Sequence, residues 1–429
     1  MSDRYQQSEL YLQRALQTIP LGSQTFSKSK TQFPYGVSPY FIERGKGSHV
    51  WDIDGNEYID FVNGLLSITL GYQDPDVDNA VREQLNKGVI FSLPHPLEAQ
   101  LAETIVEMVP CAEMVRFGKN GSDATSGAIR VARGYTGRDH VAVYGYHGWQ
   151  DWYIGSTTRS LGVPEATKAL THKFSYNDIS SLEQIFAQYP GQLAAVILEP
   201  MNVAYPENDF LAKVRDLTHK NGALLIFDET ITGFRYALGG AQGLFNVIPD
   251  LATFGKGMAN GYPLSCLVGR KEYMRLCEEI FFSFTFGGET LSLAASLAVL
   301  NKLKKEPVLE TIAAQGEALI NGIKKLITEL GMESILSICG HPSWSFLIFK
   351  DVAPYTQWDI KTLWMQEIFK RGILSIATHN LSYAHNEADI ARLLKVYSEV
   401  FPILKDAVEN NKIYEYLQCE TLKPLFKVR

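Results

Sequence analysis

Apolar and polar positions in the middle of the chain form short apolar runs separated by stretches with helical spacing. Between residues 113 and 300, the apolar runs are typical of buried strands, and the stretches between them are typical of amphipathic helices. Strands and helices in alternation predict an α/β domain with a mostly parallel sheet. The predicted strands cover residues 141–144, 194–198, 223–227 and 251–254, and the predicted helices between them cover 123–133, 180–188 and 208–220.

The two ends of the chain carry different patterns. Residues 5–18 have helical spacing, and residues 47–61 alternate around Asp54-Gly55, a turn sequence favoured in β-hairpins. We therefore expect a large α/β domain and a smaller α+β domain, with no linker rich in Pro, Gly or Ser between them. The remaining predicted helices cover 76–88, 96–109, 308–329, 355–371 and 386–407, and the remaining strand-like segments cover 344–350 and 373–376.

Composition narrows the class of protein. Of the 429 residues 46% are hydrophobic and 20% are charged, which excludes a disordered chain. A net charge of −7 argues against a nucleic-acid partner. The most apolar stretch, residues 291–300, is too short to span a membrane, and the first residues lack the apolar run of a signal peptide. Five cysteines without a C-x-x-C pair argue against a zinc site, so we expect a cytoplasmic protein without metal.

Asp228 and Lys256 are the most informative charged residues, because each follows a predicted strand. Open α/β sheets bind ligands at the carboxyl ends of their strands, so both side chains are expected at one edge. Lys256 stands between Gly255 and Gly257, where the bare backbone lets a bulky group approach. The pair suits pyridoxal phosphate, whose Schiff base a lysine forms and whose ring nitrogen an aspartate keeps protonated. The alternative is a solvated lysine and an aspartate that caps a strand.

Two other phosphate-binding motifs that contain Gly or Lys are excluded by the sequence around Lys256. A P-loop needs Ser or Thr after its lysine, where this chain has Gly257. A dinucleotide-binding fingerprint that starts at Gly255 needs a glycine at position 260, which is Asn260.

Three further segments are candidates for cofactor contacts. Gly121 and Ser122 lie at the predicted start of a helix, where free N–H groups and the helix dipole favour an anion, although an ordinary capped helix start has the same pattern. Tyr146 follows a strand beside glycine and could stack on a flat cofactor or pack in the core. The loop 283–290 could supply a further hydroxyl to a phosphate, or could only cap the following helix.

Taken together and in this order, the motifs resemble those of the class III (subgroup II) pyridoxal-phosphate-dependent aminotransferases. Within that family the likeness is closest to the glutamate-1-semialdehyde aminomutase-like aminotransferases. The resemblance covers nearly the whole chain, from about residue 18 to residue 400. The matching stretches are residues 51–60, 120–124, 132–133, 136–138, 146–148, 199–200, 227–235, 239–242, 249–251, 255–256 and 384–385.

The resemblance implies a fold and an assembly. The fold is the α/β type I fold of aspartate aminotransferase, with a large cofactor-binding domain and a smaller α+β domain built from both chain ends. The implied boundaries are residues 1–60 for the N-terminal part of the small domain, 61–305 for the large domain and 306–429 for the C-terminal part. The implied assembly is a homodimer with shared active sites.

The resemblance also implies roles for single residues. Lys256 resembles the Schiff-base lysine that moves a proton between substrate and cofactor, and Asp228 resembles the partner of the pyridine nitrogen. Gly121 and Ser122 resemble the phosphate cradle. Tyr146 resembles the aromatic residue that stacks on the cofactor ring, which makes it the third catalytic candidate after Lys256 and Asp228.

Two more cofactor contacts follow from the same likeness. Glu199 resembles a carboxylate near the hydroxyl side of the cofactor. Thr285 resembles the phosphate-binding residue that comes from the other subunit of the dimer.

The sequence departs from the family pattern at the substrate side. Thr230 stands where the family usually has a branched aliphatic residue under the cofactor ring, and residues 287–290 differ from the usual turn. Gln24 and Thr25 correspond to the Asn-Ser substrate contact of the aminomutases. The C-terminal loop 377–383 lacks the aminomutase glutamate, and its His379 is a candidate substrate contact.

These features predict an aminotransferase that moves an amino group, in our hypothesis from L-glutamate, to a carbonyl acceptor. The polar substrate residues resemble those of enzymes that make amino sugars of surface polysaccharides, which suggests a sugar-like acceptor. The first alternative is an aminomutase that acts within one molecule. The second, from another class, is a catalytically silent binding subunit.

Overall fold

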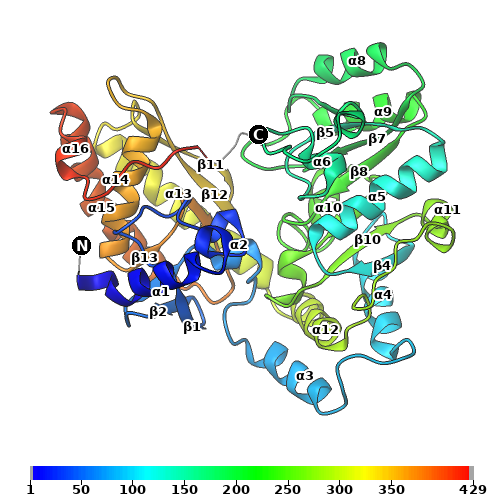
Figure 1. Ribbon diagram of the computed structural model, residues 1–429, viewed down its shortest axis with the longest axis horizontal. Helices are drawn as coiled ribbons and strands as arrows, with labels where there is room; N and C mark the ends of the chain where they lie inside the picture. Colours follow the sequence, from blue (N-terminus) through cyan, green and yellow to red (C-terminus); the bar gives the residue numbers. More distant parts are fainter. Residues whose placement is uncertain (1–2, 425–429) are drawn as a thin grey trace. The chain divides into compact units, whose positions relative to one another are not determined.

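The computed structural model describes residues 3–424, which form two compact units (Figure 1). Within the described residues, unit 1 contains residues 3–65, 70–73 and 310–424. Unit 2 contains residues 66–69 and 74–309. The domain boundaries at residues 60 and 305 that the sequence suggests stay a prediction.

A seven-stranded sheet forms the centre of unit 2, with the order β4-β10-β9-β8-β7-β5-β6. Strands β9, β8, β7, β5 and β6 are parallel, and only β10 runs antiparallel to both of its neighbours in this sheet. The predicted α/β class with a mostly parallel sheet is therefore confirmed. The strands are β4 (Met114–Gly118), β5 (His140–Tyr144), β6 (Thr171–Lys173), β7 (Leu193–Leu198), β8 (Leu224–Asp228), β9 (Leu251–Phe254) and β10 (Ser265–Gly269).

Helix α5 (Gly121–Thr136) packs its apolar face on this sheet. Ala128, Ile129 and Ala132 join one buried cluster with Val143 of β5 and Ile197 of β7. Burying a valine or isoleucine side chain such as Val143 or Ile197 stabilises the fold by roughly 1.5–3 kcal/mol. The other helices around unit 2 are α3 (Pro75–Leu85), α4 (Pro96–Met108), α6 (Asp151–Ile154), α7 (Glu165–Lys168), α8 (Ile179–Gln188), α9 (Phe210–Lys220), α10 (Gly240–Phe245), α11 (Lys271–Met274) and α12 (Thr290–Lys305), and α2 (Asn63–Leu66) joins the units in sequence.

Unit 1 combines two small sheets with long helices. One sheet has the order β1-β2-β3-β13 and contains the predicted hairpin, and the other has the order β11-β12-β14. The strands are β1 (Ile42–Lys46), β2 (His49–Asp52), β3 (Glu57–Asp60), β11 (Leu336–His341), β12 (Trp344–Phe349), β13 (Ile373–Leu374) and β14 (Thr378–Asn380). The helices are α1 (Gln6–Leu16), α13 (Val308–Glu329), α14 (Gln357–Lys370), α15 (Glu387–Glu409) and α16 (Ile413–Tyr416).

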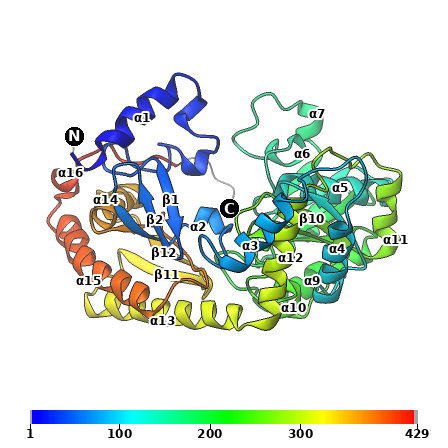
Figure 2. The same cartoon turned by 90° about the horizontal axis from the view of Figure 1, so that it is seen from below.

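Helices α14 and α15 pack together in unit 1 (Figures 1 and 2). Aromatic side chains fill the core between them. Trp364 of α14 and Tyr397 of α15 are fully buried, with ring centroids 6.0 Å apart. Phe401, one turn further along α15, stacks on Tyr397 at 5.1 Å. Large buried rings of this kind dominate the energetics of a core.

Across residues 3–424, no helix combines the length and the apolar character that a bilayer-spanning helix requires.

Candidate active site

The site begins where two parallel strands of unit 2 end side by side. Asp228 is the last residue of β8 and pairs in register with Thr253 of β9. Gly255 and Lys256 follow β9 directly, and Lys256 has a φ of 45°, which is uncommon for a residue with a side chain. Backbone in such conformations tends to occur where function requires it. The two residues that the sequence singled out therefore lie at adjacent strand ends, as predicted.

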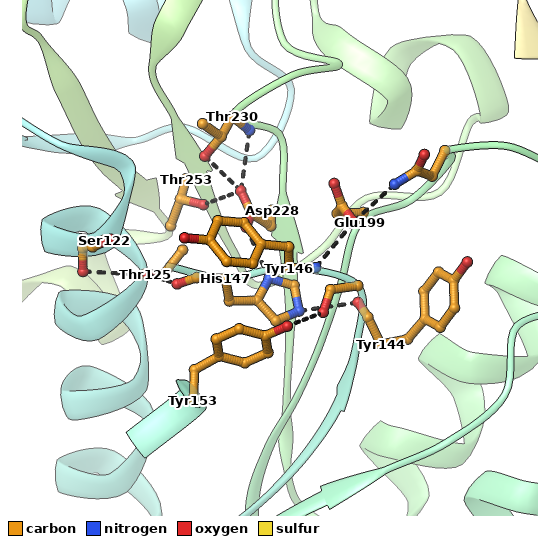
Figure 3. A network of polar contacts seen from close by, with 12 residues as sticks. Ser122, Thr125, Tyr144, Tyr146, His147, Tyr153, Glu199, Asp228, Thr230 and Thr253 are labelled. Carbon is orange, nitrogen blue, oxygen red and sulfur yellow. Dashed lines mark hydrogen bonds and ion pairs between the residues drawn. The ribbon is translucent and has the colours of Figure 1, made fainter. Parts of the chain in front are cut away.

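The Asp228 carboxylate is buried and hydrogen-bonded at both oxygens (Figure 3). Its Oδ2 lies 2.8 Å from Nδ1 of His147. Its Oδ1 accepts from the Thr230 backbone N–H at 3.1 Å, the Thr230 hydroxyl at 2.6 Å and the Thr253 hydroxyl at 3.1 Å. Burial alone would raise the pKa of this carboxyl, but the contacts with His147 and Thr230 lower the pKa of Asp228 below its ordinary value. The structure thus maintains a buried negative charge.

Thr230 connects three parts of the site. A Cβ at Gly121 would lie 3.1 Å from its methyl carbon Cγ2, and a Cβ at Gly255 would lie 3.4 Å from the same atom. The side chain of Thr230 thus binds Asp228 and also faces the start of α5 and the residue before Lys256. Thr230 has the branched shape of the aliphatic residue that the family usually has at this position, and it adds a hydroxyl.

The start of α5 has the geometry of an anion site. Asn120, rather than Ser122, is the N-cap residue, so Gly121 and Ser122 are the first two helical residues. Their N–H groups have no acceptor inside the helix, as is general for a first turn. The carboxylate of Asp123 accepts from the N–H groups of Lys119 and Asn120. Gly121 and Ser122 therefore combine two available donors with the positive end of a 16-residue helix.

The loop after β5 is fixed by two glycines. Gly148 has a φ of 106°, and a Cβ there would lie 2.2 Å from the hydroxyl of Ser122. A Cβ at Gly145 would lie 2.4 Å from the Glu199 carboxylate. Only a residue without a side chain allows these approaches. The Ser122 hydroxyl in turn accepts from the Trp149 N–H at 3.2 Å, which ties the loop to α5.

Tyr146 and Glu199 belong to this loop arrangement. The Tyr146 N–H donates to the Glu199 carboxylate at 3.1 Å, and Asn202 donates to the same oxygen at 2.9 Å. Glu199 is buried, whereas Tyr146 is 39% exposed. The ring meets Tyr153 edge-on at 5.6 Å. Glu199 thus fixes the backbone that carries the candidate stacking ring.

Thr285 lies in unit 2 on an exposed turn before α12. The neighbouring residues line a pocket of about 310 Å³ between this turn, α4 and β4. The role of Thr285 across a subunit interface stays a prediction.

The three candidate substrate residues lie in unit 1. Gln24 is exposed and Thr25 half-buried, in a bend of the N-terminal segment. His379 is fully buried on β14, with its ring nitrogens 3.0 Å from the Ser345 hydroxyl and 2.8 Å from the Tyr397 hydroxyl. Burial lowers the pKa of His379 to about 3. This arrangement favours a structural role for the His379 ring, and the substrate contacts of all three residues stay predictions.

Sequence reasoning did not name His147 or Thr253 as site residues, and it noted Thr230 only as a departure from the family pattern under the cofactor ring. His147 directly follows the stacking candidate, and Thr230 lies two residues after Asp228, so both positions carried a signal. Thr253 carried none, because only the strand register places it opposite Asp228. Within residues 3–424 no three side chains of His, Cys, Asp or Glu form a group that could hold a metal ion.

Comparison with known proteins assigns the family. The model of the class-III aminotransferases matches residues 32–339. A 3-aminobutyryl-CoA aminotransferase of Cloacimonas acidaminovorans is 36% identical, over 90% of this chain and 94% of its own length. A glutamate-1-semialdehyde 2,1-aminomutase of Aquifex aeolicus is 33% identical, over 94% and 99%.

Solved structures agree in fold. The FumI protein of Sphingopyxis sp. MTA144, in its pyridoxal phosphate internal aldimine form, matches with a TM-score of 0.87 at 30% identity, over 94% of this chain and 97% of that chain. An omega-transaminase from Sphaerobacter thermophilus matches with a TM-score of 0.87 at 26% identity, over 94% of this chain and 100% of that chain. The fold and site define a pyridoxal-phosphate-dependent enzyme of fold type I. The chain belongs to the class III aminotransferase family.

The residues present fit pyridoxal phosphate. Gly121, Gly148 and Gly255 leave bare backbone around Thr230 and Ser122, where Cβ atoms would come within 2.2 to 3.4 Å of other side chains. The start of α5 suits the phosphate, Asp228 suits a protonated ring nitrogen, and Lys256 suits the aldehyde.

Proposed function

We propose that the enzyme transfers an amino group from a small-molecule donor to a carbonyl acceptor in two half-reactions. The observation that carries this proposal is the placement of Lys256 and Asp228 at adjacent strand ends, with the start of α5 joined to them through Thr230. Family membership supports the same class of reaction.

Each residue has a physical role in this proposal. Bound pyridoxal phosphate supplies an electron sink for the substrate carbon. Lys256 would hold the cofactor and, once its amine is free, would remove and return a proton at that carbon. Asp228 holds the ring nitrogen protonated through its negative charge. The N–H groups of Gly121 and Ser122 hold the phosphate, and Tyr146 covers the ring.

Relatives support more than one substrate class. One relative is named for 3-aminobutyryl-CoA, and several are named glutamate-1-semialdehyde aminomutases. L-glutamate as donor and a sugar-like acceptor stay our hypothesis for this chain, because Gln24 and Thr25 are uncharged and polar. Gln24→Ala and Thr25→Ala should then raise KM for the acceptor while the half-reaction with the donor is retained.

Absorbance spectroscopy tests the proposal directly. The purified protein with pyridoxal phosphate should show the band of a lysine-bound cofactor, and L-glutamate should convert it to the pyridoxamine form. Lys256→Ala should abolish the band, whereas Lys213→Ala, on the exposed face of α9, should leave it unchanged. Absence of the band in the parent protein contradicts the proposal, and a silent binding subunit would show no spectral change with any amine.

An aminomutase is the second candidate, because relatives of that name match over 94% of the chain. The need for an external amino donor separates the two reactions. Single-turnover mixing with a panel of amino donors should yield free keto product if the enzyme is a transaminase. Rearrangement of one substrate without any donor would favour the aminomutase.

A homodimer in the cytoplasm completes the proposal. Exposed apolar side chains lie around the turn that carries Thr285, among them Phe281 (83% exposed) and Phe286 (59%). Leu93, on the loop before α4, is 80% exposed. Apolar surface of this kind supports contact with a second copy of the chain.

A further inference from the structure

His147 is enclosed between two hydrogen-bond partners beneath the loop that carries Tyr146 (Figure 3). Its Nδ1 lies 2.8 Å from Asp228 Oδ2, and its Nε2 lies 3.0 Å from the Tyr144 carbonyl oxygen. The side chain has no exposed surface, and its ring faces those of Trp152 and Tyr153 at 6.3 and 5.2 Å. Both ring nitrogens are therefore directed at protein atoms.

Both of these partners are acceptors. A backbone carbonyl oxygen only accepts hydrogen bonds, and so does an ionised carboxylate. A neutral imidazole has one N–H donor and one bare nitrogen, so it can satisfy only one of the two contacts. The other contact would then bring two lone pairs together in a buried site, which is strongly unfavourable. A second proton is needed, on Asp228 or on His147.

The surroundings of Asp228 argue against a proton on the carboxyl. Its Oδ1 already accepts from the Thr230 backbone N–H, which can only donate, and from the hydroxyls of Thr230 and Thr253. These donors stabilise the ionised carboxylate.

We propose that His147 is a positioning residue whose ring carries a proton on both nitrogens and forms a buried ion pair with Asp228. This inference deepens the proposed function and rests on it, because it takes Asp228 as the partner of the cofactor nitrogen. The pair has no net charge, so it is less costly to bury than a lone carboxylate. A carboxylate hydrogen-bonded at both oxygens is a weak base, so it holds a protonated ring nitrogen by charge rather than by removing its proton.

Other groups around the ring do not supply the missing proton. Thr125 donates its hydroxyl to the His147 carbonyl at 2.8 Å, not to the ring. Tyr153 donates its hydroxyl to the Gly145 carbonyl at 2.6 Å, and Trp152 donates its indole N–H to Ser126 at 2.9 Å. The two protons on the imidazole therefore point to Asp228 and to the Tyr144 carbonyl.

Nitrogen NMR of the full chain with labelled histidine tests the protonation state. The chain has 9 histidines, and the signal of His147 is assigned by its loss in His147→Gln. We expect two nearly equal ring nitrogen signals, each coupled to a proton, near neutral pH in the protein without cofactor. Two well-separated signals, one protonated and one bare, would overturn the proposal whether or not a cofactor binds.

The cofactor spectrum tests the positioning role. His147→Gln should shift the absorbance maximum of bound pyridoxal phosphate and weaken its binding about tenfold, because an amide cannot supply the charge-assisted bond. His219→Gln is the matched control, since His219 pairs with Asp250 at the same 2.8 Å but is 39% exposed. It should leave the spectrum and the binding unchanged.

The Thr125→Val variant distinguishes a role of the His147 ring in positioning Asp228 from a role of His147 in supporting the loop after β5. It removes the hydroxyl contact to the His147 carbonyl but leaves the ring contacts, so it should lower thermal stability without shifting the spectrum. An unshifted spectrum in His147→Gln, or an equal shift in Thr125→Val, contradicts the positioning role. If the parent protein binds no cofactor, the proposed function fails, while the NMR result on the ion pair still stands.

Discussion

Thr230 combines two contacts that a single hydrophobic residue could not make. Its methyl group faces the bare backbone of Gly121 and Gly255, and its hydroxyl donates to Asp228 at 2.6 Å. Valine would match the shape and lose the hydrogen bond. Asp228 is fully buried, so each donor contributes to keeping it ionised.

The residue-scale prediction concerns this hydroxyl. Thr230→Val should destabilise unit 2 by about 1–2 kcal/mol near neutral pH, since it removes a hydrogen bond to a charged group. The native fold lowers the pKa of Asp228, so the stabilisation is present above the unfolded pKa and is lost as pH falls through the folded one. The difference between Thr230→Val and the parent should therefore shrink in acid.

Urea unfolding at a series of pH values measures this difference. Thr230→Ser is the control, because it keeps the hydroxyl and removes only the methyl group. A Thr230→Val penalty that does not change with pH would show that packing, rather than the charge of Asp228, sets the effect.

At the scale of elements, close contacts of helices with their neighbours decide where glycine is required. Gly316 lies inside α13, and a Cβ there would come within 1.8 Å of the Pro342 carbonyl oxygen, in the turn between β11 and β12. Gly134 lies inside α5, and a Cβ there would find its nearest neighbour at 3.9 Å. The two glycines occupy similar helix interiors but different surroundings.

Alanine substitutions at these glycines should have opposite effects. Gly134→Ala should stabilise the protein by about 0.5–1 kcal/mol, because alanine favours a helix. Gly316→Ala should destabilise it by about 1–3 kcal/mol, because the turn must move away from the helix. Hydrogen exchange of β11 and β12 should rise in Gly316→Ala only. Equal stabilisation by both substitutions would contradict the close contact at Pro342.

The elements also show what a sequence pattern can and cannot predict. The predicted strands and helices between residues 123 and 254 are confirmed, because their apolar periods match buried faces. Strand β10 was missed, since Ser265 and Gly269 leave it an apolar run of only three residues, and its antiparallel direction depends on partners that are not its neighbours in sequence. The predicted strand 373–376 is shorter in the structure, which pairs only Ile373 and Leu374 with β3.

The site, like the strands and helices, was predictable where the sequence signal is local. Lys256 and Asp228 follow apolar strands, and that signal is local. The contacts of Thr253 and His147 with Asp228 come from β9 and from the loop after β5, so they depend on the order of strands in the sheet, whereas the contact of Thr230 is local. The His379 ring lies 2.8 Å from the Tyr397 hydroxyl, which belongs to a different element, so this contact could not be predicted locally.

At the scale of the whole molecule, the proposed homodimer predicts complementation between subunits. If Thr285 serves the site of the other subunit, Lys256→Ala and Thr285→Asp chains should each lack normal cofactor binding. Mixed and reassembled, they should recover about a quarter of the parent sites, because half of the dimers are mixed and each has one intact site.

Absorbance after mixing, with sedimentation to confirm the dimer, measures this recovery. Thr285→Ser should bind the cofactor normally without mixing. A monomer that binds the cofactor tightly, or the absence of recovery in a confirmed mixed dimer, would contradict the role of Thr285.

The parallel pairing of β3 with β13 has a consequence for synthesis on the ribosome. Residues 57–60 must wait for residues 373–374, and the roughly 300 residues between them take about 15 to 60 s to translate. During that time the nascent hairpin has an unsatisfied edge, which could recruit a chaperone or another unfinished chain. The strands of the unit 2 sheet are all synthesised by Gly269, about 100 residues before β13, so that sheet can form while the N-terminal hairpin still has an open edge.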